Sequence, residues 1–275
     1  MKSNHPMRIV FIAVALLLAL CTPAMMKKGF SQSQSATSFA PPVDKEQLWH
    51  IQVYRVKPSN MTEFISFIKH EMNPARIKGG ANRLDYWETV YGNATELINI
   101  APMPGGYAEI GQPNTVSKAL GEGASGLFAR QARFIEERLN YIVRYDPTLS
   151  FTSAKFQGKP DWAIFNVAEL APGQAKAYED WLKNDFIPAE RQGSSLARWY
   201  TKMRFGGDMN NTYLMLRPLS SPAEIEQPAP NADARARAAN VNDKLPAGAI
   251  ARQDRRRLRY RPDISIFDGK IAESK

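Results

Sequence analysis

The sequence is poor in the side chains that bind transition metals or attack substrates. Its 275 residues include one cysteine, Cys21, and three histidines. One cysteine cannot form a disulfide within the chain, and no second histidine follows His70-Glu71 at the spacing of a zinc-binding helix. No Ser-His-Asp or Cys-His signature of nucleophilic catalysis is present either. We therefore expect no metal, no cofactor and a fold that depends on its hydrophobic cores alone.

The sequence also lacks an apolar run long enough to cross a bilayer as a helix. The run at residues 9–21 falls short of the roughly 20 residues that a span needs. Basic residues Lys2 and Arg8 precede it, and the small residues Thr22-Pro23-Ala24 follow it. This order predicts a secretory signal peptide over residues 1–24 and hence an exported protein, periplasmic or secreted.

Two other interpretations of this N-terminal segment stay open. Lys27 and Lys28 are unusual just after a cleavage site and are compatible with an uncleaved membrane anchor. Cys21 is a candidate lipid acceptor, although the bulky Leu20 stands where such sites need a small residue. Residues 25–46 follow as a predicted flexible tether, because their centre is rich in Ser, Gln, Ala and Pro without periodicity.

Acidic residues are fewer than basic ones, which gives the chain a net charge of +9. Six arginines cluster between Arg252 and Arg261. Apart from Tyr260, this cluster lacks the aromatic side chains on which nucleic-acid bases stack, and an exported protein does not meet the genome. We therefore expect no nucleic-acid partner. A solvated surface, or weak contact with an anionic surface or polymer, explains the cluster better.

The chain repeats itself at an offset close to 115 residues. The stretch Arg144–Phe151 returns as Arg259–Ile266, and Ala108–Pro113 returns as Ala223–Pro228. Several matches at nearly one offset indicate an internal duplication. The length of the chain is also suited to two domains of roughly 110 residues each.

Each copy shows the element order βαββαβ, which predicts the α+β class and a ferredoxin-like unit. We place the first unit at residues 47–151, a linker at 152–160, the second unit at 161–266 and a tail at 267–275. In such a unit both helices cover the same face of the sheet, so the other face stays bare. Two units can cover each other by closing their bare faces into a pseudo-dimeric α/β barrel.

The first predicted helix begins near Asn60 and carries an apolar face. That face consists of Met61, Phe64, Ile65, Ile68 and Met72. His70 lies opposite this face by helical periodicity and should point to solvent. Proline cannot donate an amide hydrogen, so we expect Pro74 to end this helix and Pro188 to end its counterpart, which begins at Gln174.

These residues resemble the NIPSNAP-like branch of the dimeric α/β-barrel families, and the resemblance covers nearly all of the chain after residue 46, twice. The motifs that carry it are Val56-Lys57-Pro58, Pro74, Gly79-Gly80, Asp85-Tyr86-Trp87-Glu88 and the Gly92-Asn93 turn before Leu97–Ile100. The resemblance implies the fold and leaves the function open. Relatives on this scaffold include cofactor-free monooxygenases, haem-binding enzymes, isomerases and proteins of no known activity. Homo-oligomers are also compatible with it.

The two faces of the first strand differ in polarity. Ile51 and Val53 match apolar residues in the second copy, so we expect this face to lie under the helices. His50, Gln52 and Tyr54 occupy the opposite face, which is polar and differs between the copies. An uneven polar face suits the lining of a pocket between the two units.

Matching the copies gives a candidate set of pocket residues. In the second strand, Asp85 and Trp87 are matched with Arg198 and Tyr200, and Gln52 is matched with Asn166. The candidate ligand-binding residues are Gln52, Tyr54, Asp85, Trp87, Asn166, Arg198 and Tyr200, with His50 as the candidate proton acceptor. In the alternative interpretation these groups satisfy one another across the two units, for example Asp85 beside Arg198, without any ligand.

Two classes of function fit this pattern. One is a non-catalytic exported module, which could bind a small apolar or aromatic molecule in the barrel. The other is a cofactor-independent monooxygenase or isomerase, which needs an apolar pocket and His50 as proton acceptor. We favour the module, because a single interior histidine is little support for catalysis.

Overall fold

The computed structural model describes residues 45–272, except residues 92–93, 155, 157–159, 193–196, 220 and 227–239. These described residues belong to one compact unit. The predicted signal peptide over residues 1–24, nearly all of the tether and the Gly92-Asn93 turn lie outside the described residues. Within the described part, no helix is long and apolar enough to span a membrane.

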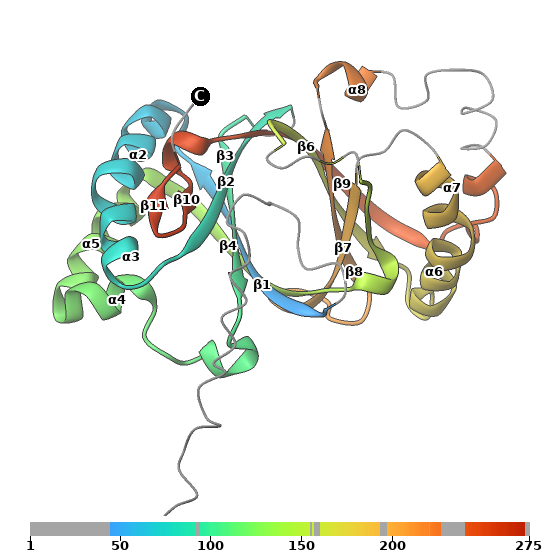
Figure 1. Ribbon diagram of the computed structural model, residues 1–275, viewed down its shortest axis with the longest axis horizontal. Coiled ribbons are helices and arrows are strands. Elements are labelled where there is room, and N and C mark those ends of the chain that lie inside the picture. The colour runs from blue at the N-terminus through green and yellow to red at the C-terminus, as the bar shows by residue number, and fades with distance from the viewer. Residues whose placement is uncertain are drawn as a thin grey trace, which may run out of the picture. The chain divides into compact units, whose positions relative to one another are not determined.

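Eight strands form the central barrel, four from each half of the chain (Figure 1). The strands of the first half are β1 (Gln47–Val56), β2 (Arg83–Tyr91), β3 (Glu96–Met103) and β4 (Ile135–Tyr145). The strands of the second half are β6 (Trp162–Leu170), β7 (Ala197–Phe205), β8 (Thr212–Leu219) and β9 (Ile250–Tyr260). Shorter strands lie outside the ring, namely β5 (Phe151–Thr152), β10 (Ile266–Phe267) and β11 (Lys270–Ile271).

The order of the strands is the same in the two halves. The first sheet runs β2-β3-β1-β4 and the second runs β7-β8-β6-β9, with every pairing antiparallel. Strand β4 pairs with β7, and β9 pairs with β2, so the ring closes without a free edge. The structure confirms the expected α+β class and the barrel built from two ferredoxin-like sheets.

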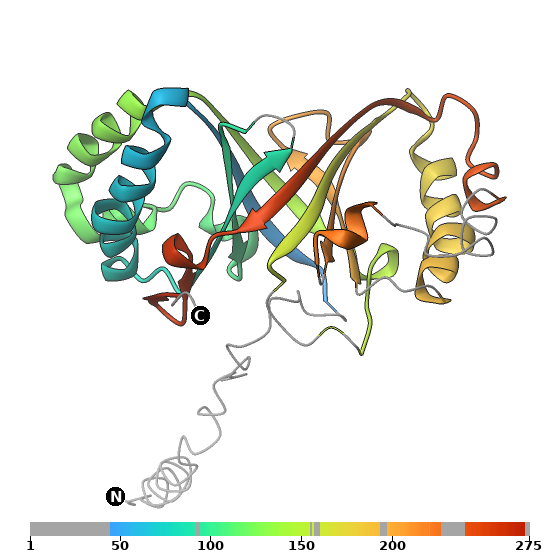
Figure 2. The same cartoon turned by 90° about the horizontal axis from the view of Figure 1, so that it is seen from above.

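Helices cover the outside of the ring on two opposite sides (Figure 2). Those of the first half are α2 (Met61–Phe67), α3 (Asn73–Lys78), α4 (Thr115–Leu120) and α5 (Ala124–Phe134). Those of the second half are α6 (Ala175–Trp181) and α7 (Ile187–Gln192), while the short α8 (Ala223–Glu226) lies apart from them (Figure 1). His70 is exposed, as its place opposite the apolar face predicts.

The prolines Pro74 and Pro188 do not end their helices, in contrast to the prediction. A wide π-helical turn, Ile68–Met72, joins α2 to α3, and Leu182–Phe186 joins α6 to α7 in the same way. Each proline is then the second residue of the next α-helical segment. Proline is tolerated in a first helical turn, where an amide hydrogen is not needed. The π-helical turn thus lets each helix continue past its proline.

The barrel interior is apolar, and it is lined by the face of β1 that was predicted to lie under the helices. Ile51 and Val53 pack with Phe165 and Leu214 in one buried cluster that spans both halves. Tyr54 packs instead against helix residues of the first half, such as Phe64. The predicted assignment of the two faces was therefore wrong. A buried apolar cluster packs on each face of this strand, so the more apolar face need not be the one under the helices.

The second strand of each copy was matched one residue out of register. Asp85 and Trp199 take the same place relative to the neighbouring strands, which is an offset of 114 residues. The prediction had matched Asp85 with Arg198, at 113. A slip of one residue sends every side chain of a strand to the other face. Consequently Arg198 and Tyr200 lie under the helices of the second half, while Asp85 and Trp87 face the interior.

One end of the barrel interior is closed by charged side chains. Arg256 Nε donates to Glu96 Oε2 at 2.5 Å, and Glu96 is 1% exposed. Arg256 Nη1 also lies 2.8 Å from Asp254 Oδ2, and Arg55 bonds both Glu96 and Glu137. A buried carboxylate shared by two guanidinium groups is compensated in charge. This end is consequently a closed polar plug rather than a ligand opening.

The two halves exchange short segments that follow their last strands. Residues 146–151 of the first half pack on β7, where Phe151 pairs with Arg198, and residues 261–266 of the second half pack on β2, where Ile266 pairs with Leu84. Figure 1 shows the C-terminal β10 beside the helices of the first half. These segments are the repeated stretches of the sequence.

A buried serine anchors each exchanged segment. Ser150 Oγ accepts a hydrogen bond from Tyr200 N at 2.9 Å, and Ser265 Oγ accepts one from Tyr86 N at 2.8 Å. Each serine hydroxyl also donates to a carbonyl four residues earlier in its own segment, at 2.7 Å and 2.8 Å. Each hydroxyl thus accepts a hydrogen bond from a backbone amide of a strand in the opposite half.

We predict that Ser150→Ala and Ser265→Ala each destabilise the protein by about 1–3 kcal/mol, because each change leaves a buried amide hydrogen without a partner. The measurement is urea unfolding followed by tryptophan fluorescence. Ser125→Ala, at an exposed helical serine, is the control and should change stability by less than about 0.5 kcal/mol. Equal stability of all three variants and the wild type would contradict the anchoring role.

Candidate functional site

The predicted site residues lie in three separate places rather than in one pocket. His50, Gln52 and Tyr54 lie between the first sheet and its helices. Three further candidates, Asn166, Arg198 and Tyr200, lie on the corresponding face of the second sheet. Asp85 and Trp87 face the barrel interior. The structure therefore does not assemble the predicted set into a single site.

The first place is a network of hydrogen bonds among polar side chains. Gln52 Nε2 donates to Asn140 Oδ1 at 2.7 Å, and Tyr54 Oη donates to Gln52 Oε1 at 2.8 Å. Asn99 Nδ2 donates to Gln52 Oε1 at 3.1 Å and lies 3.2 Å from Tyr54 Oη. Each amide and hydroxyl in this network finds a partner inside it. These residues satisfy one another within the first half, rather than across the two units as the alternative interpretation had it.

A buried guanidinium extends this network. Arg76, on α3, donates to Asn73 Oδ1 at 3.2 Å, to the Tyr86 hydroxyl, and to Tyr54 Oη at 3.5 Å. Burial lowers the pKa of Arg76, but the surrounding Tyr86 and Tyr54 oxygens more than offset that effect, so its pKa is raised. Burial raises the pKa of Tyr86 to about 12. Both groups keep their protons at neutral pH.

His50 lies at the edge of this network. Burial lowers the pKa of His50, the side chain of Asn140 raises it, and the charges of Arg76 and Arg138 lower it further, with a net lowering. The imidazole is therefore neutral at pH 7 and can accept a proton.

The second place combines arginine and tyrosine side chains. Arg198 Nε donates to Glu190 Oε2, on α7, at 2.6 Å, and the Arg198 guanidinium lies 4.9 Å from the centre of the Phe186 ring. Burial raises the pKa of Tyr200 to about 12. The pairing of Arg198 with Asp85 that the alternative interpretation suggested does not occur, because the two residues lie on opposite faces of their sheets.

Asp85 is fully buried and has partners of its own. Its carboxylate accepts a hydrogen bond from Arg83 Nε at 2.9 Å, and Tyr260 Oη lies 3.4 Å from it. Trp87 packs against Tyr260, with ring centres 5.1 Å apart. These contacts make Asp85 and Trp87 part of the barrel wall.

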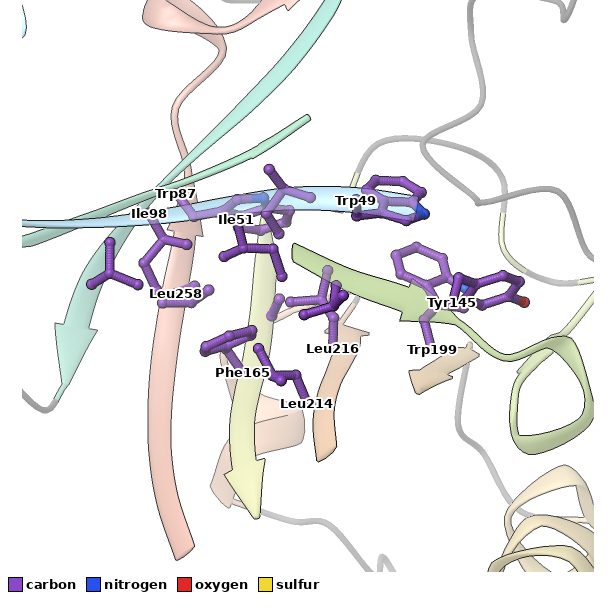
Figure 3. Packing of buried hydrophobic residues seen from close by; sticks show 14 of the residues in the cluster. Trp49, Ile51, Trp87, Ile98, Tyr145, Phe165, Trp199, Leu214, Leu216 and Leu258 are labelled. Atoms are coloured by element: carbon purple, nitrogen blue, oxygen red, sulfur yellow. The ribbon is translucent and has the colours of Figure 1, made fainter. Parts of the chain in front are cut away.

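A small cavity lies inside the barrel, at the end opposite the charged plug. Its volume is about 40 Å³. The lining residues are Trp49, Ile51, Ile100, Tyr145, Phe165, Trp199, Thr201, Leu214 and Leu216. Figure 3 shows that three of them, Trp49, Tyr145 and Trp199, gather at one end of the cluster. We call these three residues the aromatic end.

Two buried polar atoms at the aromatic end lack a partner among the described residues. They are Trp49 Nε1 and Tyr145 Oη. Burial raises the pKa of Tyr145 to about 12, although the side chain of Ser150 partly opposes this, so the Tyr145 hydroxyl keeps its proton at neutral pH. The Ser150 hydroxyl is already engaged with Asp146 O and Tyr200 N, and it makes no hydrogen bond of normal geometry with Tyr145 Oη. Unpaired buried polar atoms are rare in native proteins, and each such atom requires an explanation.

The difference between the two copies explains why Tyr145 is unpaired. Its counterpart, Tyr260, lies beside the carboxylate of Asp85. At the matching position the second copy has Trp199, whose Nε1 donates to Thr152 Oγ1 at 3.0 Å and cannot accept a hydrogen bond. Trp199 thus stands where the other copy has the carboxylate of Asp85, so Tyr145 has no such acceptor.

The sequence-based prediction missed all three residues of the aromatic end. Trp49 was missed because its face of β1 was assigned to the helices. Trp199 was matched with Tyr86 instead of Asp85. An offset of 114, as between Pro74 and Pro188, would have placed Trp199 on the interior face. No local sequence signal singles out Tyr145, which lies in the repeated stretch itself.

Within the described residues, no three histidine, cysteine, aspartate or glutamate side chains come close enough to hold a metal ion. The cavity lining is free of carboxylate, imidazole and amine groups. The geometry of the aromatic end is therefore suited to binding by apolar contact and hydrogen bonding.

Comparison with known proteins identifies the fold. No protein-family model and no curated protein matches the sequence. Among solved structures, an anthrone oxidase-like protein matches with a TM-score of 0.57 at 12% identity, over 86% of this chain and 99% of that one. A candidate monooxygenase from Lactobacillus acidophilus matches with a TM-score of 0.52 at 9% identity, over 84% and 100%.

A second candidate monooxygenase, from Fusobacterium nucleatum, matches with a TM-score of 0.52 at 12% identity, over 83% of this chain and 98% of the other. Likeness at such low identity shows the fold alone. The chain has the dimeric α+β-barrel fold, with both units in one chain.

We predict that the protein loses stability as the pH falls from 7.5 to 5.5, because the unfolded chain binds a proton to His50 more readily than the folded chain does. The stability associated with neutral His50 is present above pH 6.5 and is lost as the pH falls through the lower folded-state pKa. This loss of stability is measured as the fall in melting temperature between pH 7.5 and pH 5.5. His50→Gln should flatten the slope, whereas the exposed control His70→Gln should keep it. An unchanged slope in His50→Gln would contradict the assignment.

Proposed function

We propose that the protein binds a small planar aromatic molecule at the aromatic end of its barrel, without converting it. The two unpaired polar atoms beside an apolar cavity carry this proposal. This proposal keeps the sequence-based expectation of a module that binds an aromatic molecule in the barrel. Its site, however, consists of residues that the sequence did not indicate.

The chemistry of the site specifies a ligand with a polar oxygen on an aromatic body. Trp49 Nε1 is a donor only, and the protonated Tyr145 hydroxyl can donate or accept. A carbonyl or phenol oxygen placed between them would receive hydrogen bonds that the protein itself does not supply. The ring of Trp199 and the aliphatic lining provide the apolar contacts.

The size of the cavity limits the ligand. Its volume of about 40 Å³ is far below the roughly 300 Å³ at which drug-sized pockets begin. A bound ring system therefore requires a side chain of the aromatic end to rotate. Trp49 is the candidate, because it is 7% exposed and the Arg83 guanidinium lies over its ring, 5.6 Å from the ring centre.

Binding is favoured over catalysis because the site lacks a proton acceptor that could work near neutral pH. The lining contains one ionisable group, Tyr145, with a pKa of about 12. General acid–base catalysis is most effective when the pKa of the group lies close to the working pH.

We predict that 2-naphthol quenches the tryptophan fluorescence of the protein and that Tyr145→Phe weakens its binding by about tenfold, which corresponds to one hydrogen bond. Binding of naphthalene, which lacks the oxygen, should change little in this variant. Tyr260→Phe is the matched control, because it removes the same hydroxyl from the other copy. The assigned hydrogen bond would be rejected if Tyr145→Phe weakened the binding of 2-naphthol and naphthalene equally. It would also be rejected if Tyr145→Phe and Tyr260→Phe weakened the binding of 2-naphthol equally.

A second candidate function is an enzyme of the cofactor-independent monooxygenase or isomerase type with His50 as proton acceptor. The observation in its favour is the lowered pKa of His50 beside a buried, protonated Arg76 that could stabilise an anion. The internal pairing of Gln52, Asn99 and Tyr54 counts against it. Membership of the NIPSNAP-like branch, which rests on the sequence motifs, likewise stays a proposal.

The enzyme hypothesis predicts consumption of oxygen or formation of an isomer from a bound hydroxylated aromatic compound. We expect no product after long incubation in air, measured by mass spectrometry of the ligand and by an oxygen electrode. A product formed by the wild type and reduced at least a hundredfold in His50→Gln, with binding retained, would establish the enzyme instead. The exposed His70→Gln variant is the control.

A further inference from the structure

Two arginines lie side by side on the helix-covered face of the second sheet. The β7–β8 register places Trp199 opposite Leu216, so the next pair along the strands is Arg198 and Arg217. Arg198 is 9% exposed and Arg217 is 6% exposed. Like charges directly opposite each other in a sheet destabilise it. The protein therefore buries two adjacent cations at an energetic cost.

Among the described residues, Arg198 has a hydrogen-bonded carboxylate partner and Arg217 has none. Arg198 donates to Glu190 at 2.6 Å. Arg217 makes no hydrogen bond or ion pair with any described residue, and its Nε is buried without a partner. Burial, followed by the charge of Arg198, lowers the pKa of Arg217, and the charges of Glu190 and Glu224 only partly oppose this.

The first copy does not carry these charges. At the positions equivalent to Arg198 and Arg217, by the registers of the paired strands, it has Leu84 and Ala101. Leu84 belongs to the buried cluster of the first half, and Ala101 packs against that cluster. Apolar residues therefore occupy these two positions in the first copy and pack into its core. The first copy shows that this part of the fold can form without the two arginines, and such local violations are typical of functional sites.

A second unpaired polar atom lies on the same face. Asn166 Oδ1 is buried without a partner among the described residues. Its strand neighbours are Met215 and Arg255, and Ile164, two residues before it, lies opposite Arg217. Diagonal neighbours of this kind are about 7–8 Å apart, which a long side chain spans. The amide and the guanidinium can therefore contact one ligand.

We propose that Arg217, with Arg198 and Asn166 beside it, forms a binding site for a small oxyanion on the helix-covered face of the second sheet. This site is separate from the aromatic end and does not depend on the function proposed there. A guanidinium binds a carboxylate through two parallel hydrogen bonds, and such charge-assisted bonds are about twice as strong as neutral ones. The anion would also relieve the repulsion between the two arginines.

The surroundings favour an organic carboxylate over inorganic phosphate. The buried cluster of this face includes Tyr178, Trp181, Tyr200 and Met215. Their rings and sulfur offer apolar contact to the body of an aromatic acid. We therefore expect benzoate to bind more tightly than phosphate.

The test is titration calorimetry with benzoate and with inorganic phosphate, in a buffer of zwitterions and at low chloride. We expect one benzoate per chain, and a melting temperature raised by about 5–10 °C at a concentration of a hundred times the dissociation constant. Benzoate should not raise the melting temperature of Arg217→Met. It should still raise that of Arg252→Met, which removes an exposed arginine of the basic cluster.

The melting temperature without anion separates a binding role from a structural one. Arg217→Met should be at least as stable as the wild type in the anion-free buffer, because it removes an uncompensated buried charge. A lower melting temperature would mean that Arg217 is structural and would overturn the proposal. The proposal would also be overturned if neither anion changed the melting temperature of the wild type. The same holds if benzoate changed the melting temperatures of Arg217→Met and Arg252→Met equally. Tighter binding of phosphate than of benzoate through Arg217 would support the oxyanion site and identify an inorganic source.

Discussion

Reciprocal pairing of the two halves is the constraint on which the rest of the structure depends. Strands β2 and β7 are the edges of their own sheets, and an open edge leaves backbone groups without partners. Each edge is satisfied by the opposite half, along its length by β9 or β4 and near its start by the exchanged segment. The buried serines Ser150 and Ser265 complete this pairing. The interior cluster can form only once both halves are joined in this way.

The internal repeat made the fold predictable, and the same repeat limited what could be predicted about the site. Strand spacing and the offset near 115 indicated two ferredoxin-like units, and the structure has them. The face of β1 could not be assigned, because Ile51 inside the barrel and Val56 under the helices are both apolar and both buried. The one-residue error in the second strand then moved Arg198 and Tyr200 to the wrong face. Proline is a reliable helix stop only where the helix is regular, and here π-helical turns precede Pro74 and Pro188.

The candidate sites arise from differences between the copies rather than from the shared fold. Trp199 takes the place of Asp85 and leaves Tyr145 unpaired, while Arg198 and Arg217 take the places of apolar residues. In a barrel made of two identical chains, every such change would occur twice. Joining both units in one chain lets one half keep a packed, satisfied interior while the other half carries unpaired groups. The sequence contained these differences, but only the correct register reveals which residues they bring together.

The exchanged C-terminal segment has a consequence for the order of events during synthesis. A chain emerges from the ribosome N-terminus first, and domains often fold as they emerge. Here the edge strand β2 pairs with Ile266, which belongs to the second half and is made after the whole first half. The first half therefore stays incomplete until the second half has been made, with its edge and its apolar face uncovered until then. Protection of the nascent first half is thus a requirement that this architecture places on the cell that makes it.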